Sequence, residues 1–530
     1  MYEMFKERLS RTISRHLFLP LYAYTYTEIC FCPVTLQKQK AKFMRSLLLC
    51  FTLVASTLFG QSFVQRGGTH LVLDNTTYRF SGPNIEWLGL EGYGPHDPFG
   101  PRYPSHFEID DAFATAAEMG AKVVRSQTMG DTVGCPRCIE PEEGQFNQSA
   151  FQASDYALSV AARYHMKVII TLIGDCATCY GGGIGQYLAW HKKASFQDFF
   201  TDPALIAAYE HHIDAVLNHR NAITGIFYRD DPTILAWENC NMCGIFSIFA
   251  HGNLADVANW SETIGKHIKS IDHHHLYLDT TGVFRNYPGI LNNPSVDLFA
   301  FEEYPHWAAL LGPGAPPMTA ETIAQDAATV VSHGKVFIVN EFGWDKTNWA
   351  TPVDLQRVLD SFLNNPDISG DGFWALQAHL DNFGFQPIPA DTTDPEFARK
   401  GESGEWWALY YPGRKTLVMS AEDMAGRAQQ LRAHAYQMSG LPVPKHAVPP
   451  SPVVSSVVFG GLVAWRGSAG ATRYSIESMA PGSSEWKLIC DRCATDEQDP
   501  WIDPHPMLGT RYRVTAYNSD NVASATSAPK

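Results

Sequence analysis

Val336-Phe337-Ile338-Val339-Asn340-Glu341-Phe342-Gly343 is an apolar run that leads directly into an amide and a carboxylate. Four consecutive apolar residues between polar or glycine positions are typical of a buried strand. Similar runs recur along the chain, with stretches of helical periodicity between them, such as Ser154–Tyr164 and Pro203–Asn218. The strand candidates are Lys122–Arg125, Lys167–Ile173, Ile234–Glu238, Leu298–Glu302, Val336–Glu341 and Gly372–Leu376.

This alternation predicts the α/β class. Units of strand followed by helix continue over nearly 400 residues, from about Phe63 to His446, and such units build a parallel sheet. The length suits a (β/α)₈ TIM barrel with insertions, which we assign to residues 61–440. In that fold the chemistry lies where strands run out into loops, so carboxylates at strand ends are the first candidates for a site.

Two segments follow the barrel. Residues 441–452 are rich in proline and predict a semi-rigid linker. Residues 453–530 hold short alternating segments that predict a small all-β sandwich. Its Trp465, its Tyr474 and the run Tyr512–Asn518 resemble a fibronectin type III domain. A spacer or stabilising role is favoured for it over sugar binding.

Residues 1–60 predict an upstream segment and a signal peptide. Lys40, Lys42 and Arg45 precede the apolar run Leu47–Ala55, and small residues follow it, which is the order of a secretory signal beginning near Met44. The run is too short for a comfortable transmembrane helix. We therefore expect a secreted or periplasmic protein with no stable membrane span after signal removal.

The composition excludes some partners. With 40 Lys and Arg against 55 Asp and Glu, the formal charge is −15, which disfavours nucleic acid and allows neutral polysaccharide. The glycine-rich stretch Gly181–Gly185 lacks the Lys-Ser/Thr of a phosphate-binding loop, and we expect no cofactor and no metal.

Eight cysteines remain after the signal, all in Cys-x-x-Cys pairs: Cys135/Cys138, Cys176/Cys179, Cys240/Cys243 and Cys490/Cys493. In an oxidising compartment such pairs favour disulfides. A tetrahedral zinc site and a thiol-dependent function are the alternatives.

Several runs are similar to the endo-β-1,4-mannanase branch of glycoside hydrolase family 5, almost continuously over residues 63–446. They are Phe63-Val64-Gln65-Arg66, Tyr78–Asn84 with Trp87, Tyr180-Gly181-Gly182 with Gln186-Tyr187 and Trp190, Asn221–Gly225, Asp230–Ile234 and Ala236-Trp237-Glu238. The resemblance implies a retaining glycosidase acting on a β-1,4-linked mannan-like polysaccharide.

A retaining mechanism needs two carboxyl groups about 5–5.5 Å apart, one as nucleophile and one as acid and base. Glu341 matches the family's nucleophile. The proton donor's position, however, is occupied by Met242, whose thioether has no proton to give. Glu302 stands where the family has a histidine beside the catalytic pair, so we hypothesise that Glu302 is a relocated proton donor. The alternative is that it fills a hydrogen-bonding gap in an inactive barrel.

The resemblance also implies substrate-binding residues: Arg125 beside the nucleophile, Asn241 on the sugar 2-hydroxyl, Tyr304, and Trp374 as a sugar platform. Trp307 is added by its position alone. Three hypotheses follow: a mannanase-type glycosidase, a catalytically inactive β-glycan-binding barrel, and a metal- or thiol-dependent variant.

Overall fold

The computed structural model describes residues 62–92, 100–174, 182–304, 319–344, 351–386, 408–416, 418–458, 461–497 and 499–530. Residues 61–530 form one compact unit, separate from residues 1–60. The predicted signal peptide, Trp307 and the pair Cys176/Cys179 lie outside the described residues.

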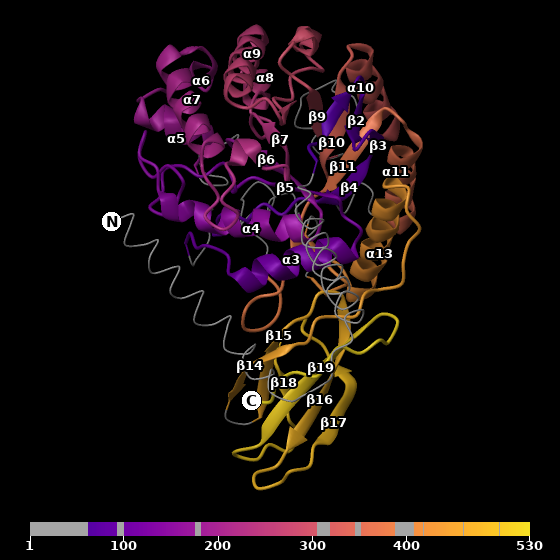
Figure 1. Cartoon of the computed structure of the whole chain (residues 1–530). Coiled ribbons are helices and arrows are strands. Elements are labelled where there is room, and N and C mark those ends of the chain that lie inside the picture. Colours follow the sequence, from indigo (N-terminus) through magenta and orange to yellow (C-terminus); the bar gives the residue numbers. More distant parts are fainter. Residues whose placement is uncertain are drawn as a thin grey trace, which may run out of the picture. The chain divides into compact units, whose positions relative to one another are not determined.

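Eight parallel strands form the central sheet (Figure 1). They are β4 (Phe80–Pro83), β5 (Val123–Ser126), β6 (Lys167–Thr171), β7 (Ile234–Glu238), β8 (Leu276–Asp279), β9 (Leu298–Glu303), β10 (Val336–Phe342) and β11 (Ile368–Phe373). The first and last strands are neighbours, since β11 pairs with β4. The amide of Ile85 donates to the Arg125 carbonyl at 2.9 Å, which joins β4 to β5 and closes the sheet. The predicted TIM barrel is confirmed.

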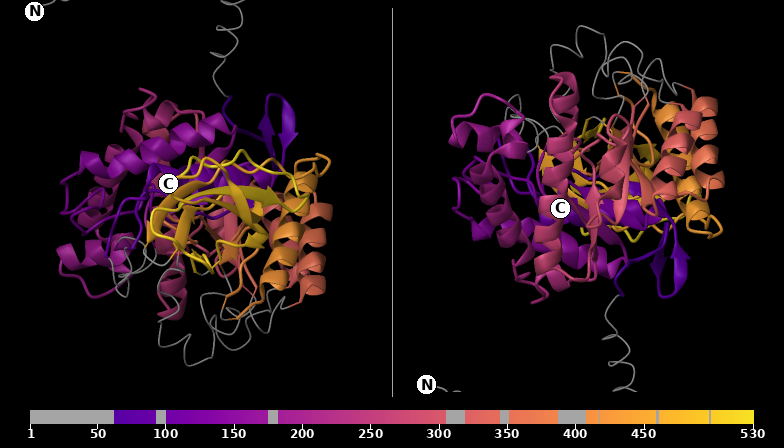
Figure 2. Two further views of the ribbon diagram at one scale, coloured as in Figure 1. Left: turned by 90° about the horizontal axis from the view of Figure 1, so that it is seen from below. Right: turned by 90° about the horizontal axis from the view of Figure 1, so that it is seen from above.

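Helices lie outside the strands in both views of Figure 2. They are α3 (His106–Glu118), α4 (Phe151–Arg163), α5 (Gly183–Trp190), α6 (Asp198–Thr201), α7 (Pro203–Leu217), α8 (Ile245–Phe249), α9 (Leu254–Ile271), α10 (Ala320–Ser332), α11 (Pro352–Asn364) and α13 (Ala421–Met438). Short 3₁₀ helices are η2 (Gln148–Ala150), η3 (Tyr228–Asp230) and η4 (Pro288–Asn292). Helix α3 begins with a capping box. The Ser105 hydroxyl accepts from the Glu108 amide, and the Glu108 carboxylate accepts from the Ser105 amide. Among the described residues, no helix is long and apolar enough to cross a membrane.

A small antiparallel sheet precedes the barrel and packs on the inner apolar residues of its strands. Its strands are β1 (Gln65–Gly67), β2 (His70–Leu73) and β3 (Thr76–Tyr78). Leu71 of β2 belongs to one buried cluster with Val123, Leu298 and Val336, which stand at or near the starts of their strands. The amino-terminal end of the barrel is therefore apolar, and the polar residues collect at the other end.

The C-terminal β region, residues 453–530, consists of two three-stranded sheets around their own core. One sheet has the order β14 (Val453–Val458), β15 (Leu462–Arg466) and β18 (Trp501–Ile502); the other has β17 (Lys487–Ala494), β16 (Ala471–Met479) and β19 (Arg511–Asn518). Trp465 and Tyr474 lie at its centre, with ring centroids 5.1 Å apart. The predicted all-β region is thus present, as two packed antiparallel sheets.

The strand predictions hold for most of the barrel, with one clear error. Ile234–Glu238 is a strand with the expected bounds, but the predicted strand Gly372–Leu376 begins four residues late, because β11 spans Ile368–Phe373. The first four of the six residues of β11 read Ile-Ser-Gly-Asp, which carries little of the apolar signal of a buried strand. A separate two-residue strand, β12 (Leu376–Gln377), pairs with β13 (Leu409–Tyr410).

A buried histidine joins the barrel to the C-terminal β region. His379 Nδ1 lies 2.8 Å from Asp111 Oδ2 of α3, and its Nε2 lies 2.9 Å from Asp496 Oδ2. Burial alone would lower the pKa of His379, but the charges of Asp111 and Asp496 raise it to about 10.

This ion cluster predicts a pH-dependent stability. Since the pKa of His379 is raised from 6.5 on folding, its stabilisation is complete below pH 6.5 and is lost as the pH rises towards 10. The loss amounts to up to about 5 kcal/mol in the free energy of unfolding. Urea denaturation from pH 6 to 10 measures it, and the decline should be much smaller in His379→Gln. An equal decline in both proteins would contradict the assignment.

Candidate active site

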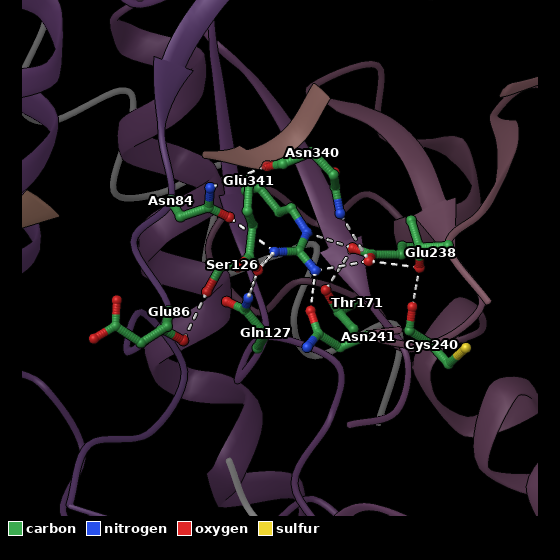
Figure 3. A network of polar contacts seen from close by, with 12 residues as sticks. Asn84, Glu86, Ser126, Gln127, Thr171, Glu238, Cys240, Asn241, Asn340 and Glu341 are labelled. Carbon is green, nitrogen blue, oxygen red and sulfur yellow. Dashed lines mark hydrogen bonds and ion pairs between the residues drawn. The ribbon is translucent and has the colours of Figure 1, made fainter. Parts of the chain in front are cut away.

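The guanidinium of Arg125, near the end of β5, is the centre of a buried polar network. Its partners Glu238, Asn241 and Glu341 are labelled in Figure 3. Its Nε and Nη2 donate to the two oxygens of Glu238 at 2.6 and 2.7 Å. Its Nη1 donates to Asn84 Oδ1 at 2.9 Å and to Glu341 Oε1, and its Nη2 donates also to Asn241 Oδ1 at 2.5 Å. All five N–H donors of the guanidinium therefore have acceptors.

Glu238 is the carboxylate that forms a two-bond ion pair with Arg125 inside the barrel. It lies at the end of β7, is fully buried, and also accepts from Thr171 Oγ1 at 2.7 Å, Thr280 Oγ1 at 2.8 Å and Asn340 Nδ2 at 3.0 Å. A carboxylate with this many donors is committed to holding the barrel interior. Glu238 therefore serves inside the barrel, as its depth in the strand suggests.

Glu341, on β10, presents its carboxylate to donors from two other strands. Besides Arg125, Gln127 Nε2 donates to Oε1 at 3.2 Å, and the Tyr304 hydroxyl donates to Oε2 at 2.8 Å. Since Oε1 accepts from two side chains and Oε2 from one, Oε2 keeps the larger capacity to contact a ligand.

Burial and charge act in opposite directions on these groups. Burial raises the pKa of Glu341, and the Arg125 charge and the Tyr304 hydrogen bond lower it again, with a raised pKa as the net result. Burial would lower the pKa of Arg125, but the charges of Glu238 and Glu341 hold it above its ordinary value. Burial together with the Glu341 and Glu302 charges raises the pKa of Tyr304, so its hydroxyl remains a donor.

Glu302 lies beside Glu341. The two residues are register partners on the neighbouring parallel strands β9 and β10, so their side chains leave the sheet on the same face. Glu302 is 2% exposed, and its charge acts on both Arg125 and Tyr304. The next residue, Glu303, points to the opposite face, where it accepts from Arg285 at 2.8 Å.

Met242 lies in a loop that differs from an ordinary strand end. Cys240 and Cys243 form a disulfide around Asn241 and Met242, and Met242 has a left-handed backbone with φ of 47°. Its side chain is 1% exposed and packs against Gly282: a Cβ added at Gly282 would lie 2.8 Å from Met242 Cε. The thioether therefore belongs to the hydrophobic core.

The structure brings together most of the residues that the sequence predicts. Arg125, Asn241, Tyr304 and Glu341 are linked by hydrogen bonds, and Glu302 is adjacent by register. Trp374 is half-buried and follows β11, where its amide donates to the Phe342 carbonyl at 2.9 Å. Cys135/Cys138 and Cys490/Cys493 also form disulfides.

Sequence reasoning missed four polar side chains of the network: Asn84, Gln127, Thr171 and Thr280. Asn84 ends the run Tyr78–Asn84 that carries the family resemblance, so a strand-end assignment could have found it. Gln127, Thr171 and Thr280 have no distinguishing local pattern. Within the described residues, no group of three His, Cys, Asp or Glu side chains could hold a metal ion.

The network predicts a large stability effect. Arg125→Met would leave Glu238 and Glu341 buried without their cation, which should lower the free energy of unfolding by about 3–5 kcal/mol. Arg125→Met/Glu238→Gln should recover part of that loss, because one uncompensated charge is gone. Urea denaturation of both variants provides the measurement.

Arg163→Met is the matched control, since Arg163 and its partner Asp110 are 58% and 45% exposed. Its effect should stay within about 0.5 kcal/mol. A similar small effect for Arg125→Met would refute the role given to the network.

Residues 61–287 match the family described as GH family 5 β-mannosidase-like. Mannan endo-1,4-β-mannosidase 1 of Oryza sativa subsp. japonica is 33% identical over 222 residues, which cover 41% of this chain and 48% of that protein. Mannan endo-1,4-β-mannosidase 7 of Arabidopsis thaliana is 32% identical over 234 residues, 43% of this chain and 51% of that protein. The chain thus spans about half the length of these curated relatives.

Solved structures share the fold. The endo-1,4-β-mannanase from Rhizomucor miehei is 21% identical, with a TM-score of 0.54 over 72% of this chain and 100% of that chain. The endo-β-1,4-mannanase from Thermotoga petrophila is 18% identical, with a TM-score of 0.51 over 85% of this chain and 98% of that chain. Residues 61–287 of this chain are thus similar to the mannosidase-like branch of glycoside hydrolase family 5, and the barrel fold is shared with solved mannanases.

Proposed function

We propose that this protein hydrolyses β-1,4-linked mannan-like polysaccharide by a retaining mechanism, with Glu341 as nucleophile and Glu302 as acid and base. The observation that carries the proposal is the pair of buried carboxyl groups at register-matched positions of β9 and β10. Both relatives named above are mannan endo-1,4-β-mannosidases, which supports the choice of substrate class.

The surroundings of Glu341 suit a nucleophile. The Arg125 charge opposes the effect of burial and favours the ionised carboxylate, and the Tyr304 hydroxyl does the same through Oε2. Two donors on Oε1 fix the plane of the carboxylate, which leaves Oε2 to attack the anomeric carbon. These contacts pre-orient the group before substrate arrives.

Glu302 suits the second carboxyl role by its position. Cα atoms of neighbouring parallel strands lie about 4.8 Å apart, so two side chains leaving the same face at one register can place their carboxyl groups about 5 Å apart. A proton carried by Glu302 would pass to the leaving glycosidic oxygen while Glu341 attacks the anomeric carbon. After the glycosyl–enzyme forms, the same group would take a proton from water.

Asn241 and Trp374 are proposed to bind sugar. Asn241 is held by Arg125 on the same side as Glu341, and its amide nitrogen is free of the guanidinium. The half-buried Trp374 follows the strand next to Glu341 and offers an aromatic face. The apolar run Leu47–Ala55 supports export of the protein to where polysaccharide is found.

One observation favours a second function. Met242 replaces the family's usual proton donor and packs against Gly282, so that position can contribute no acid. If Glu302 only fills space, the barrel binds β-glycan without cleaving it. The two functions differ in whether the glycan is cleaved, and both use the proposed sugar-binding residues.

The first test is reducing-sugar release from β-mannan, glucomannan and β-glucan. Wild-type protein should act on the mannans, and Glu341→Gln and Glu302→Gln should each lose at least about 10³-fold in kcat/KM. With an aryl β-mannoside carrying a good leaving group, Glu302→Gln should still release phenol in the first turnover, because that step needs no acid.

Glu303→Gln is the matched control, since Glu303 faces Arg285 on the other side of β9 and should keep its activity. Tight glycan binding without sugar release by the wild type would refute the hydrolase and leave the binding protein. Unchanged hydrolysis in Glu302→Gln would exclude Glu302 as the acid.

A second prediction concerns pH. The Tyr304 hydrogen bond lowers the pKa of Glu341, so Tyr304→Phe should raise that pKa. Since Glu341 must be ionised to attack, the acidic limb of the kcat/KM profile should move to higher pH. Tyr156→Phe removes a tyrosine–carboxylate bond remote from the site and should leave the limb in place. A limb that stays or moves down in Tyr304→Phe contradicts the assigned contact.

A further inference from the structure

We propose that the C-terminal β region positions Trp374, the proposed sugar platform of the barrel. Through His379, the region fixes the segment Trp374–Gln386. The inference rests on the proposed function, because it concerns binding of the same polysaccharide. His379 is then a positioning residue, which acts on substrate through Trp374 and makes no contact with it.

The barrel holds the first half of this segment by backbone hydrogen bonds and by packing. The Trp374 amide donates to Phe342, and the Leu376 amide donates to the Asn84 carbonyl at 3.0 Å. The following residues Ala375, Leu376, Gln377 and Ala378 are at most 3% exposed, so the chain between Trp374 and His379 is packed throughout. A tightly packed segment of this length transmits a shift at one end to the other.

The C-terminal β region holds the second half. Arg466 Nη2 lies 2.8 Å from Asp381 Oδ1, and its Nε donates to the Asp381 carbonyl at 2.9 Å. The ring of Phe383 meets Trp465 edge to face, with centroids 5.1 Å apart, and so joins the core of the β region. A loop of the barrel's carboxyl-terminal end is thus built into the hydrophobic core of the other region.

His379 is the point where the two sets of contacts meet. It lies between Asp111 of the barrel and Asp496 of the β region, and the Tyr474 hydroxyl donates to the same Asp496 oxygen at 2.5 Å. Gly467 allows this approach, because a Cβ there would lie 2.0 Å from His379 Cδ2. The imidazole is completely buried, so either carboxylate would lack its cation if the two regions separated.

A simple stabilising appendage would need none of this geometry. Contacts with the barrel helices, such as the Arg466 guanidinium over the ring of Phe107 of α3 at 5.0 Å from the ring centroid, would suffice to attach the region. Polar contacts of the β region instead reach His379 and Asp381, which follow β12 closely. This connection therefore fixes the segment that begins with Trp374, and through Trp374 it affects binding of the polymer.

The test compares His379→Gln and Phe383→Leu with the control Arg513→Gln, whose ion pair with Glu477 lies within the β region. The two segment variants should raise KM for soluble mannan about 5- to 20-fold, with kcat on a small aryl β-mannoside within twofold of wild type. Combined with Trp374→Ala, His379→Gln should add less than a further twofold to KM, because both act through one platform.

Hydrogen exchange of residues 374–386 gives the readout that does not require activity. Exchange there should accelerate at least tenfold in His379→Gln and stay unchanged in Arg513→Gln. Unchanged exchange, or KM effects of His379→Gln and Trp374→Ala that multiply in full, would overturn the proposal. A wild type that neither binds nor cleaves glycan would instead overturn the proposed function, while faster exchange would still establish the connection through His379.

Discussion

The bridge from Glu238 through Arg125 to Glu341 is the interaction on which the rest of the site depends. One guanidinium forms ion pairs with two buried carboxylates from strands on different sides of the barrel, and each of its five donors has an acceptor. Its removal would leave both carboxylates buried without a cation. The strand ends that carry these groups are therefore held at a fixed distance from each other. Gln127 and Tyr304, which follow β5 and β9, then donate to the carboxylate of Glu341.

The sequence predicts the barrel well because its strands are buried on both faces. Continuous apolar runs such as Ile234–Glu238 leave little choice of structure. The sequence prediction places β11 too late because Ser369, Gly370 and Asp371, which are not apolar strand formers, occupy its buried positions. Asp371 is held there by His434, 63 residues further along the chain, at 2.8 Å. A contact so distant in sequence leaves no local signal.

The candidate site divides in the same way. Glu341 and Arg125 are predictable because each follows an apolar run at a strand end. Gln127 and Thr280 are not, since a single glutamine or threonine in a loop has many ordinary roles. The role of His379 was equally hidden, as its two partners, Asp111 and Asp496, lie 268 and 117 residues away.

The loop around Met242 restricts which side chains its central position can hold. Its left-handed backbone, the flanking disulfide and the missing side chain at Gly282 form one arrangement that fits a thioether. A glutamate placed at this position alone would carry its charge into the apolar core beside Gly282. Several residues of the loop would therefore have to change together before a charged side chain could be accommodated there. As long as the disulfide and Gly282 stay in place, tolerated variation at this position is restricted to apolar side chains of similar volume.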